Sequence, residues 1–351
     1  MPSPSPQTST ETGPSDTASA DLGAARLHIV TGKGGVGKTT VACALALALA
    51  ATGKRVLIIE VEGRQGLSQT FDVAPLGTEE VKLVTHPSGG ELWGLSVDAK
   101  AALLEYLQLF YKLGRAGSAL EKIGAIDFAT TIAPGVRDVL LTGKIYEAVG
   151  RHQGGRGGKR AGALHYDAVV LDAPPTGRAV RFLNVNAGLA DVAKMGPIKT
   201  QADSITQMLH DTRTLVHMVT LLEEMPVQES LDGLRDLADV GLHLGALIVN
   251  QIREPRLTPA HLTALNGPDD TLDELLRTEL TTAGLRPTNP MINGLLSEGR
   301  DHAQRLQLQD EMAREIADAG PPVIELPALV GGIEGGGISV LADELLEQAV
   351  L

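Results

Sequence analysis

The sequence predicts an α/β protein whose mostly parallel central sheet is flanked by helices. Short apolar runs rich in Val, Ile and Leu alternate along the chain with longer stretches of helical patterning. The runs are continuously apolar, as expected for strands that are buried on both faces of a parallel sheet. The predicted strands span residues 26–32, 55–61, 166–172, 214–221, 246–252 and 322–329.

The overall composition is that of a globular protein with a large core. Of the 351 residues, 43% are hydrophobic and 21% are charged, and the formal net charge is −13. This balance excludes disorder of the whole chain. Because an acidic protein repels phosphate backbones and anionic lipids, we expect no nucleic-acid partner.

The first 24 residues are rich in Ser, Thr, Pro and Gly and lack both a basic start and an apolar signal region. They predict a disordered tail over residues 1–24, followed by a single domain over 25–351. The longest apolar stretch, residues 41–52, is too short to span a bilayer and predicts a buried helix. We therefore expect a cytoplasmic protein.

A phosphate-binding loop follows the first strand. The stretch "TGKGGVGKTT", residues 31–40, has the spacing G-x-x-x-x-G-K-T between a predicted strand and a predicted helix. In such a loop, backbone N–H groups and the helix dipole bind phosphates, Lys38 neutralises them and the Thr39 hydroxyl holds Mg²⁺. The pattern predicts a P-loop NTPase that binds a nucleoside triphosphate and Mg²⁺, and the family resemblance described below implies that the nucleotide is ATP. The expected nucleotide contacts in the loop are Gly34, Gly35, Val36, Gly37, Lys38, Thr39 and Thr40.

A second lysine in the loop, Lys33, makes the pattern K-G-G-V-G-K-T. This pattern resembles the deviant Walker A branch of P-loop NTPases, whose members are nucleotide-dependent dimers. The resemblance implies that Lys33 contacts the nucleotide phosphates, commonly those held by the partner subunit. A cation supplied by the partner would act like an arginine finger, so hydrolysis would be coupled to assembly.

The segment "YDAVVLDAPPTGRAVRFL", residues 166–183, resembles the D-T-A-P-T-G-H-T-L-R-x-L segment of the ArsA-type ATPase family. Members of this family drive arsenite pumps or target tail-anchored proteins. The resemblance implies that Asp172 holds Mg²⁺ through water and that the residues after it sense the γ-phosphate. Arg178 stands where the family usually has histidine. The matching positions of this switch are Pro175, Thr176, Gly177, Arg181 and Leu183.

Further similarities lie elsewhere in the chain, and together the resemblance covers roughly residues 25–350. In "IVNQI", Asn250 matches the asparagine that recognises adenine. "ELPALVGGIEG", which includes Pro327, resembles the loop that closes over the base. "LLEEMPVQES" and "APGVRDVL" are also similar to family segments.

The family's first switch, D-P-A-H-S-L-S-D, corresponds here to "EGRQGLSQTF". Glu62 replaces the aspartate that positions the attacking water, so the predicted catalytic residues are Lys33, Lys38, Glu62 and Asp172. The attacking water must lie in line with the bond that breaks, and the glutamate side chain is longer than that of aspartate. Slow hydrolysis is therefore an alternative to full activity. Glu60 is a second candidate for this role. The alternative interpretation is that the Glu60 carboxylate, at the end of its strand, pairs with a neighbouring basic group.

The single cysteine, Cys43, lies in the apolar helix after the loop and is expected to be a core residue. One thiol can supply neither a convergent As(III) or Sb(III) site nor a C-x-x-C zinc clasp. A metalloid-specific pump subunit and a zinc-bridged dimer are therefore disfavoured. The chain carries one P-loop, so two catalytic halves require a homodimer or a heterodimer with a paralogous ATPase.

Residues 99–150 and 185–213 interrupt the strand–helix alternation and predict a helical insertion. "ALLEYLQLFYKL" has apolar residues on more than one stripe. Two interpretations fit this pattern: a groove for a hydrophobic protein client or membrane-protein partner, and a packed core. The sequence as a whole predicts an ATP-hydrolysing dimeric switch. The alternative is a non-hydrolysing ATP-dependent binding or scaffold subunit paired with an active paralogue.

Overall fold

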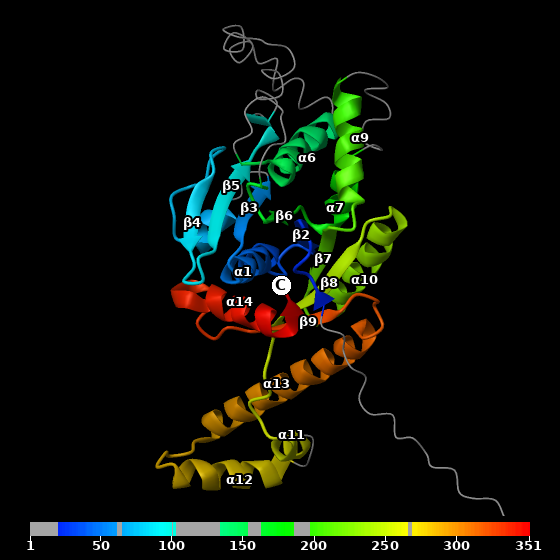
Figure 1. Ribbon diagram of the computed structural model, residues 1–351. Coiled ribbons are helices and arrows are strands. Elements are labelled where there is room, and N and C mark those ends of the chain that lie inside the picture. Colours follow the sequence, from blue (N-terminus) through cyan, green and yellow to red (C-terminus); the bar gives the residue numbers. More distant parts are fainter. Residues whose placement is uncertain are drawn as a thin grey trace, which may run out of the picture.

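The computed structural model describes residues 20–61, 65–99, 101–102, 134–153, 163–185, 197–265 and 269–351. Within these residues, an eight-stranded sheet has the order β4-β5-β3-β6-β2-β7-β8-β9 (Figure 1). All neighbouring strands are parallel except β4 and β5. The predicted α/β class is thereby confirmed. The strands are β2 (Leu27–Gly32), β3 (Arg55–Val61), β4 (Val81–Thr85), β5 (Glu91–Val97), β6 (Ala168–Asp172), β7 (Thr214–Thr220), β8 (Leu244–Ile252) and β9 (Val323–Pro327).

The antiparallel pair β4–β5 at one edge of the sheet was not predicted. β4 is short and largely exposed, with Val81 at 41% exposure. An edge strand of this kind needs no continuous apolar run, so the pattern that marks the buried strands is missing from it.

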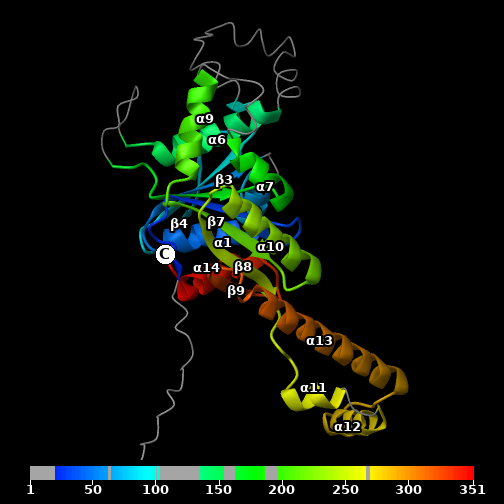
Figure 2. The same ribbon diagram turned by 90° about the vertical axis from the view of Figure 1, so that its right-hand side faces the viewer.

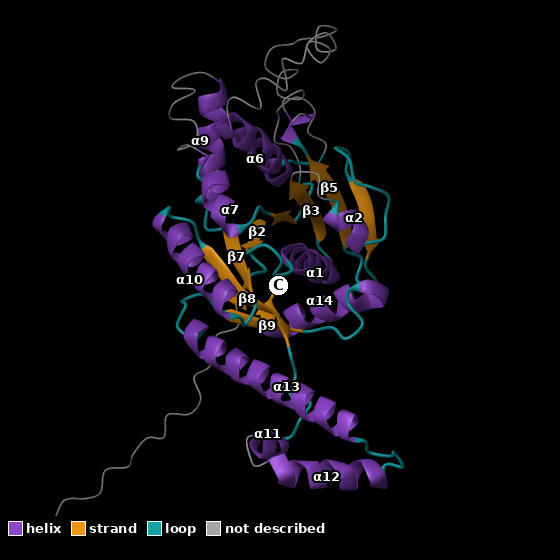
Figure 3. Ribbon diagram, turned by 180° about the vertical axis from the view of Figure 1, so that it is seen from behind, coloured by secondary structure: helices purple, strands orange, loops and turns teal. Residues whose placement is uncertain are grey.

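Helices cover both faces of the sheet (Figure 3). On one face lie α1 (Lys38–Ala51), the short α2 (Gly66–Thr70) and α14 (Gly337–Gln348). Cys43 is completely buried in α1, as predicted, and this burial raises the pKa of its thiol. The other face carries α6 (Pro134–Gly150), α7 (Thr176–Leu183), α9 (Pro197–Leu209) and α10 (Glu224–Asp239).

The described parts of the predicted insertion are helical. α6 and α9 pack against each other (Figures 1 and 2). Ala202, Ile205 and Leu209 of α9 are buried in the same core as Val139 and Ile145 of α6. These two helices are therefore packed against a core, whereas residues 103–113 of "ALLEYLQLFYKL" lie outside the described residues, so the choice between a groove and a packed core there stays a prediction. The division into a tail and one domain with an insertion remains a prediction.

An arm of three helices between β8 and β9 was not predicted. It consists of α11 (Pro259–Leu265), α12 (Asp269–Thr282) and α13 (Asn289–Ile316). Figure 2 shows the arm, yellow to orange, projecting away from the sheet. It has a small core of its own, formed by Leu272, Ile292 and Leu296. At its root, the Gln309 side chain hydrogen-bonds the backbone of Arg253.

The two ends of the described chain meet. β1 (Ala20–Asp21) pairs in parallel with β10 (Ala349–Val350), and Leu22 next to it is buried. β1 and Leu22 thus lie on the amino-terminal side of the predicted boundary at residue 25. Within the described ranges, every helix is too short or too polar to span a bilayer.

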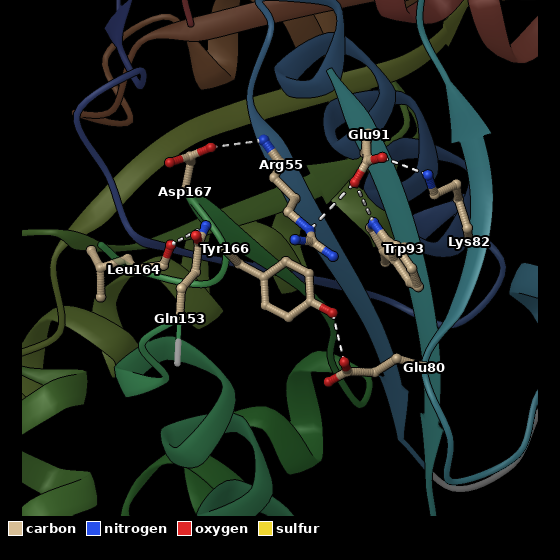
Figure 4. A network of polar contacts seen from close by, with 9 residues as sticks. All are labelled: Arg55, Glu80, Lys82, Glu91, Trp93, Gln153, Leu164, Tyr166 and Asp167. Carbon is tan, nitrogen blue, oxygen red and sulfur yellow. Dashed lines mark hydrogen bonds and ion pairs between the residues drawn. The ribbon is translucent and has the colours of Figure 1, made fainter. Parts of the chain in front are cut away.

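A polar network fastens the amino-terminal ends of β3, β5 and β6 (Figure 4). The Arg55 guanidinium lies 5.0 Å from the centre of the Trp93 ring and 5.6 Å from that of Tyr166. The Tyr166 hydroxyl donates to Glu80 at 2.7 Å. Burial and this hydrogen bond raise the pKa of Tyr166. The network stabilises the end of the sheet at which these strands begin, which is opposite the end that carries the P-loop.

Candidate nucleotide-binding site

The P-loop connects β2, in the middle of the sheet, to α1. Gly37 ends the loop with a φ of 87°, in the left-handed region. A Cβ there would lie 2.3 Å from Asn250 Nδ2, so both backbone conformation and space require glycine. Gly34 and Gly35 are exposed, whereas Val36 is buried and anchors the loop. The loop therefore has the strand–turn–helix setting that the motif predicts.

The two loop lysines have different partners. Lys38 is buried, and its Nζ donates to the Lys33 carbonyl at 2.8 Å. Lys33 Nζ lies 2.8 Å from Glu229 Oε1 on α10, and these side chains are 28% and 43% exposed. Sequence reasoning missed Glu229. It lies within the family-like "LLEEMPVQES" stretch, but nothing in that pattern points to Lys33.

The two predicted Mg²⁺ ligands lie together. Thr39 is in the first turn of α1, and its Oγ1 donates to Asp172 Oδ2 at 2.6 Å. Asp172 ends β6, the strand beside β2, and is 8% exposed. Thr40 follows in α1 and is half-buried.

Glu60 lies on the neighbouring strand β3, in register with Asp172. It is 1% exposed. Its Oε1 accepts hydrogen bonds from the Gln65 amide at 2.9 Å and the Ser96 hydroxyl at 3.0 Å, and its Oε2 accepts one from the Leu67 amide at 3.2 Å. Its partners in the described chain are thus amides and a hydroxyl, which corrects the expected pairing with a basic group. Glu62 lies outside the described residues.

The predicted base-recognition residues lie at the carboxyl ends of β8 and β9. Asn250 Nδ2 donates to the Val36 carbonyl at 2.9 Å, and Asn250 Oδ1 accepts from the Gln251 amide at 3.0 Å. Pro327 is in register with Ile252. Asn250 therefore holds the P-loop in place, a contact that sequence reasoning did not anticipate.

The segment after Asp172 runs between β2 and α10. Thr31 Oγ1 donates to the Pro174 carbonyl at 2.8 Å. Thr176 begins α7 and packs so closely on Gly233 of α10 that a Cβ there would lie 2.3 Å from Thr176 Cγ2. Arg178 and Arg181 are exposed on α7. α10 thus contacts both the predicted γ-phosphate switch and Lys33.

A glycine loop between a central parallel strand and a helix, with a hydroxyl and a strand-end carboxylate joined beside it, defines the chain as a P-loop NTPase fold. Comparison with known proteins identifies the branch. The anion-transporting ATPase (ArsA ATPase) family matches residues 25–201. The chain therefore belongs to the ArsA-type ATPase family, as its two phosphate motifs indicated.

Individual relatives agree with this assignment. The chain is 46% identical to ATPase BagA of Mycobacterium tuberculosis over 330 residues, which cover 94% of this chain and 95% of the relative. It is 25% identical to ATPase GET3 of Kluyveromyces lactis over 261 residues, 65% of this chain and 72% of the relative. It is 26% identical to the arsenical pump-driving ATPase of Acidiphilium multivorum over 239 residues, 63% of this chain and 38% of the relative.

Proposed function

We propose that this chain is a Mg²⁺-dependent ATPase that works as a nucleotide-dependent dimer. The observation that carries the proposal is the 2.6 Å hydrogen bond between Thr39 and Asp172, next to the P-loop. The three relatives named above are all called ATPases, which supports the same activity.

The loop suits a triphosphate. A Cβ at Gly34 or Gly35 would meet no atom within 4 Å, so the backbone there is open to a ligand. We assign the phosphates to the amides of residues 34–40 and to the Lys38 ammonium, and the base to Asn250 and the loop that begins at Pro327.

The Thr39 hydroxyl and the Asp172 carboxylate suit Mg²⁺, because this ion prefers hard oxygen ligands. We assign the ion to these two side chains, with Asp172 acting through water. A bound Mg²⁺ neutralises the charge that develops on the β- and γ-phosphates. We further assign Glu62 to positioning the attacking water.

Dimerisation is proposed because the chain has one P-loop and a second loop lysine. In the proposed dimer, Lys33 leaves Glu229 of its own chain and contacts the nucleotide of the partner. The partner is either a second copy or a paralogous ATPase. Such an exchange is feasible because an ion pair with both side chains partly exposed contributes only ~0.2–1 kcal/mol.

The client is proposed to be a hydrophobic protein or a membrane-protein partner, in the cytoplasm, rather than a metalloid. The only thiol, Cys43, is buried in α1 and cannot converge with others on a soft ion. The same count of cysteines argues against a zinc clasp between subunits.

A second candidate is a non-hydrolysing subunit that binds ATP and needs an active paralogue. It is favoured by the replacement of the family's aspartate with Glu62.

Calorimetric titration of the wild type with ATP, with and without Mg²⁺, tests the proposal. We expect Mg²⁺ to tighten ATP binding in the wild type, no measurable binding in Lys38→Ala, and loss of the Mg²⁺ effect in Asp172→Asn. ATP binding that Asp172→Asn leaves equally dependent on Mg²⁺ would contradict the assigned metal site. Turnover of the wild type on its own excludes the second candidate.

A further inference from the structure

Glu60 is a buried carboxylate beside the proposed Mg²⁺ site, and the proposed mechanism does not use it. We propose that Glu60 is a positioning residue: it fixes the Gln65–Leu67 turn against Thr39 and thereby sets how the Thr39 hydroxyl meets Mg²⁺. This inference rests on the proposed function and deepens it.

Three hydrogen bonds from the protein hold the Glu60 carboxylate. A buried carboxylate is expensive unless hydrogen bonds satisfy its charge. Here the three donors are the Gln65 and Leu67 amides and the Ser96 hydroxyl, at 2.9, 3.2 and 3.0 Å. Two of the three belong to the turn, so the charge on Glu60 specifies where the turn lies.

The turn is an unfavourable conformation that needs such support. Gln65 has a φ of 58°, in the left-handed region, although it is not a glycine. Its side chain is also fixed, because its Oε1 accepts from the Leu76 amide at 2.9 Å and its Nε2 donates to the Leu76 carbonyl at 3.1 Å. The Glu60 carboxylate and the Gln65 amide group thus hold the turn from two sides.

The turn also contacts the end of the P-loop, at Thr39. Gly66 packs so closely on Thr39 that a Cβ at Gly66 would lie 2.8 Å from Thr39 Cγ2. The other branch of the same side chain, Oγ1, donates to Asp172. Contacts therefore run without a break from Ser96 through Glu60 and the turn to Thr39 and Asp172. A shift of the turn changes the rotamers open to Thr39.

The geometry favours positioning over proton transfer. Both carboxylate oxygens of Glu60 already accept hydrogen bonds from the protein, and the side chain is only 1% exposed. A general base must instead reach the proton that it abstracts.

The first test is Glu60→Gln, which keeps the shape but turns one acceptor into a donor facing an amide. We expect the Mg²⁺ concentration for half-maximal ATP hydrolysis to rise ~10-fold, the effect typical of lost outer-shell support, with ATP affinity in the absence of Mg²⁺ unchanged. Hydrogen exchange of the amides of residues 65–67 should become ~10-fold faster. Asp167→Asn is the matched control, because Asp167 accepts a hydrogen bond from the Arg55 amide at 2.8 Å. This bond lies at the other end of the sheet, where the strands begin. Unchanged Mg²⁺ dependence together with unchanged exchange would overturn the inference.

The second test does not need Glu60→Gln to fold. Gly66→Ala introduces a methyl group against Thr39 Cγ2, and Thr39→Ser removes that methyl group while keeping the hydroxyl. We expect Gly66→Ala to raise the Mg²⁺ requirement ~10-fold and the double variant to recover the value of Thr39→Ser alone. Strictly additive effects would overturn the inference. If the wild type bound no ATP, the proposed function would fail, whereas the exchange experiment would still decide whether Glu60 holds the turn.

Discussion

Lys33 Nζ lies 2.8 Å from Glu229 Oε1 of the same chain, which joins the P-loop to α10. In the proposed dimer this lysine has a different partner, the nucleotide held by the other subunit. If two copies of this chain form that dimer, the ion pair between Lys33 and Glu229 would compete with assembly, because it would break in both subunits.

Replacement of Glu229 by Gln should tighten the ATP-dependent dimer. Two partly exposed ion pairs of ~0.5 kcal/mol each correspond to about a fivefold lower dissociation constant. Light scattering over a range of protein concentrations, with ATP and Mg²⁺, measures this change. Glu224→Gln, the same charge change in the first turn of α10, is the control. A weaker dimer in Glu229→Gln would mean that Glu229 contacts the partner subunit directly.

Gly37→Ala should destabilise the fold. Alanine is strained at a φ of 87°, and its Cβ would meet Asn250 Nδ2 at 2.3 Å. We expect the free energy of unfolding to fall by at least about 2 kcal/mol in urea denaturation. Gly34→Ala provides the comparison, because a Cβ there meets no atom within 4 Å. Equal stability of the two variants would contradict the described loop geometry.

Much of the site could be predicted because its signals are local in the sequence. The P-loop and Asp172 lie within short motifs, each at the end of a strongly apolar strand. The partners of Lys33 and Glu60 could not be predicted in this way. Glu229 becomes the partner of Lys33 only through the orientation of α10. The hydrogen bonds to Glu60 come from backbone amides of a turn, and no residue type encodes these. The arm was missed for a related reason: its polar helices bury few apolar residues and leave a weak pattern.

Asn250 should matter for stability as well as for nucleotide binding. Asn250→Ala leaves the Val36 carbonyl without its 2.9 Å donor. We expect a loss of about 1–2 kcal/mol in the free energy of unfolding, together with weaker ATP binding. The isosteric Asn250→Asp places an oxygen against that carbonyl and should lose at least as much. Weaker ATP binding at unchanged stability would show that Asn250 acts on the nucleotide alone.

Acid should destabilise the fold through a buried histidine pair. His28 Nδ1 and His217 Nε2 are 3.1 Å apart on β2 and β7, and both side chains are fully buried. Burial lowers the pKa of His217 to about 4, and burial followed by the charge on His217 lowers that of His28 well below its ordinary value. Both are therefore neutral in the fold at neutral pH.

The unfolded chain binds protons at these histidines below pH ~6.5, whereas the fold does not. The free energy of unfolding therefore carries the full contribution of these neutral histidines above that pH. It falls as the pH is lowered toward the pKa that each histidine has in the folded protein. For His217 alone the loss is about 2 kcal/mol between pH 6.5 and pH 5. Urea denaturation at these two pH values should show a smaller loss in His217→Gln than in the wild type. The exposed His261→Gln should behave like the wild type, and an equal loss in all three proteins would contradict this account.

Steady-state ATP hydrolysis with Mg²⁺, measured alongside light scattering at the same protein concentration, tests whether the chain is a dimeric P-loop ATPase. The wild type, Lys38→Ala and Glu62→Gln are compared. We predict that the wild type turns over as a dimer and that both variants lose at least about 100-fold in rate. A wild type that turns over as a monomer, or a Lys38→Ala variant with undiminished turnover, would contradict the proposal of a dimeric P-loop ATPase.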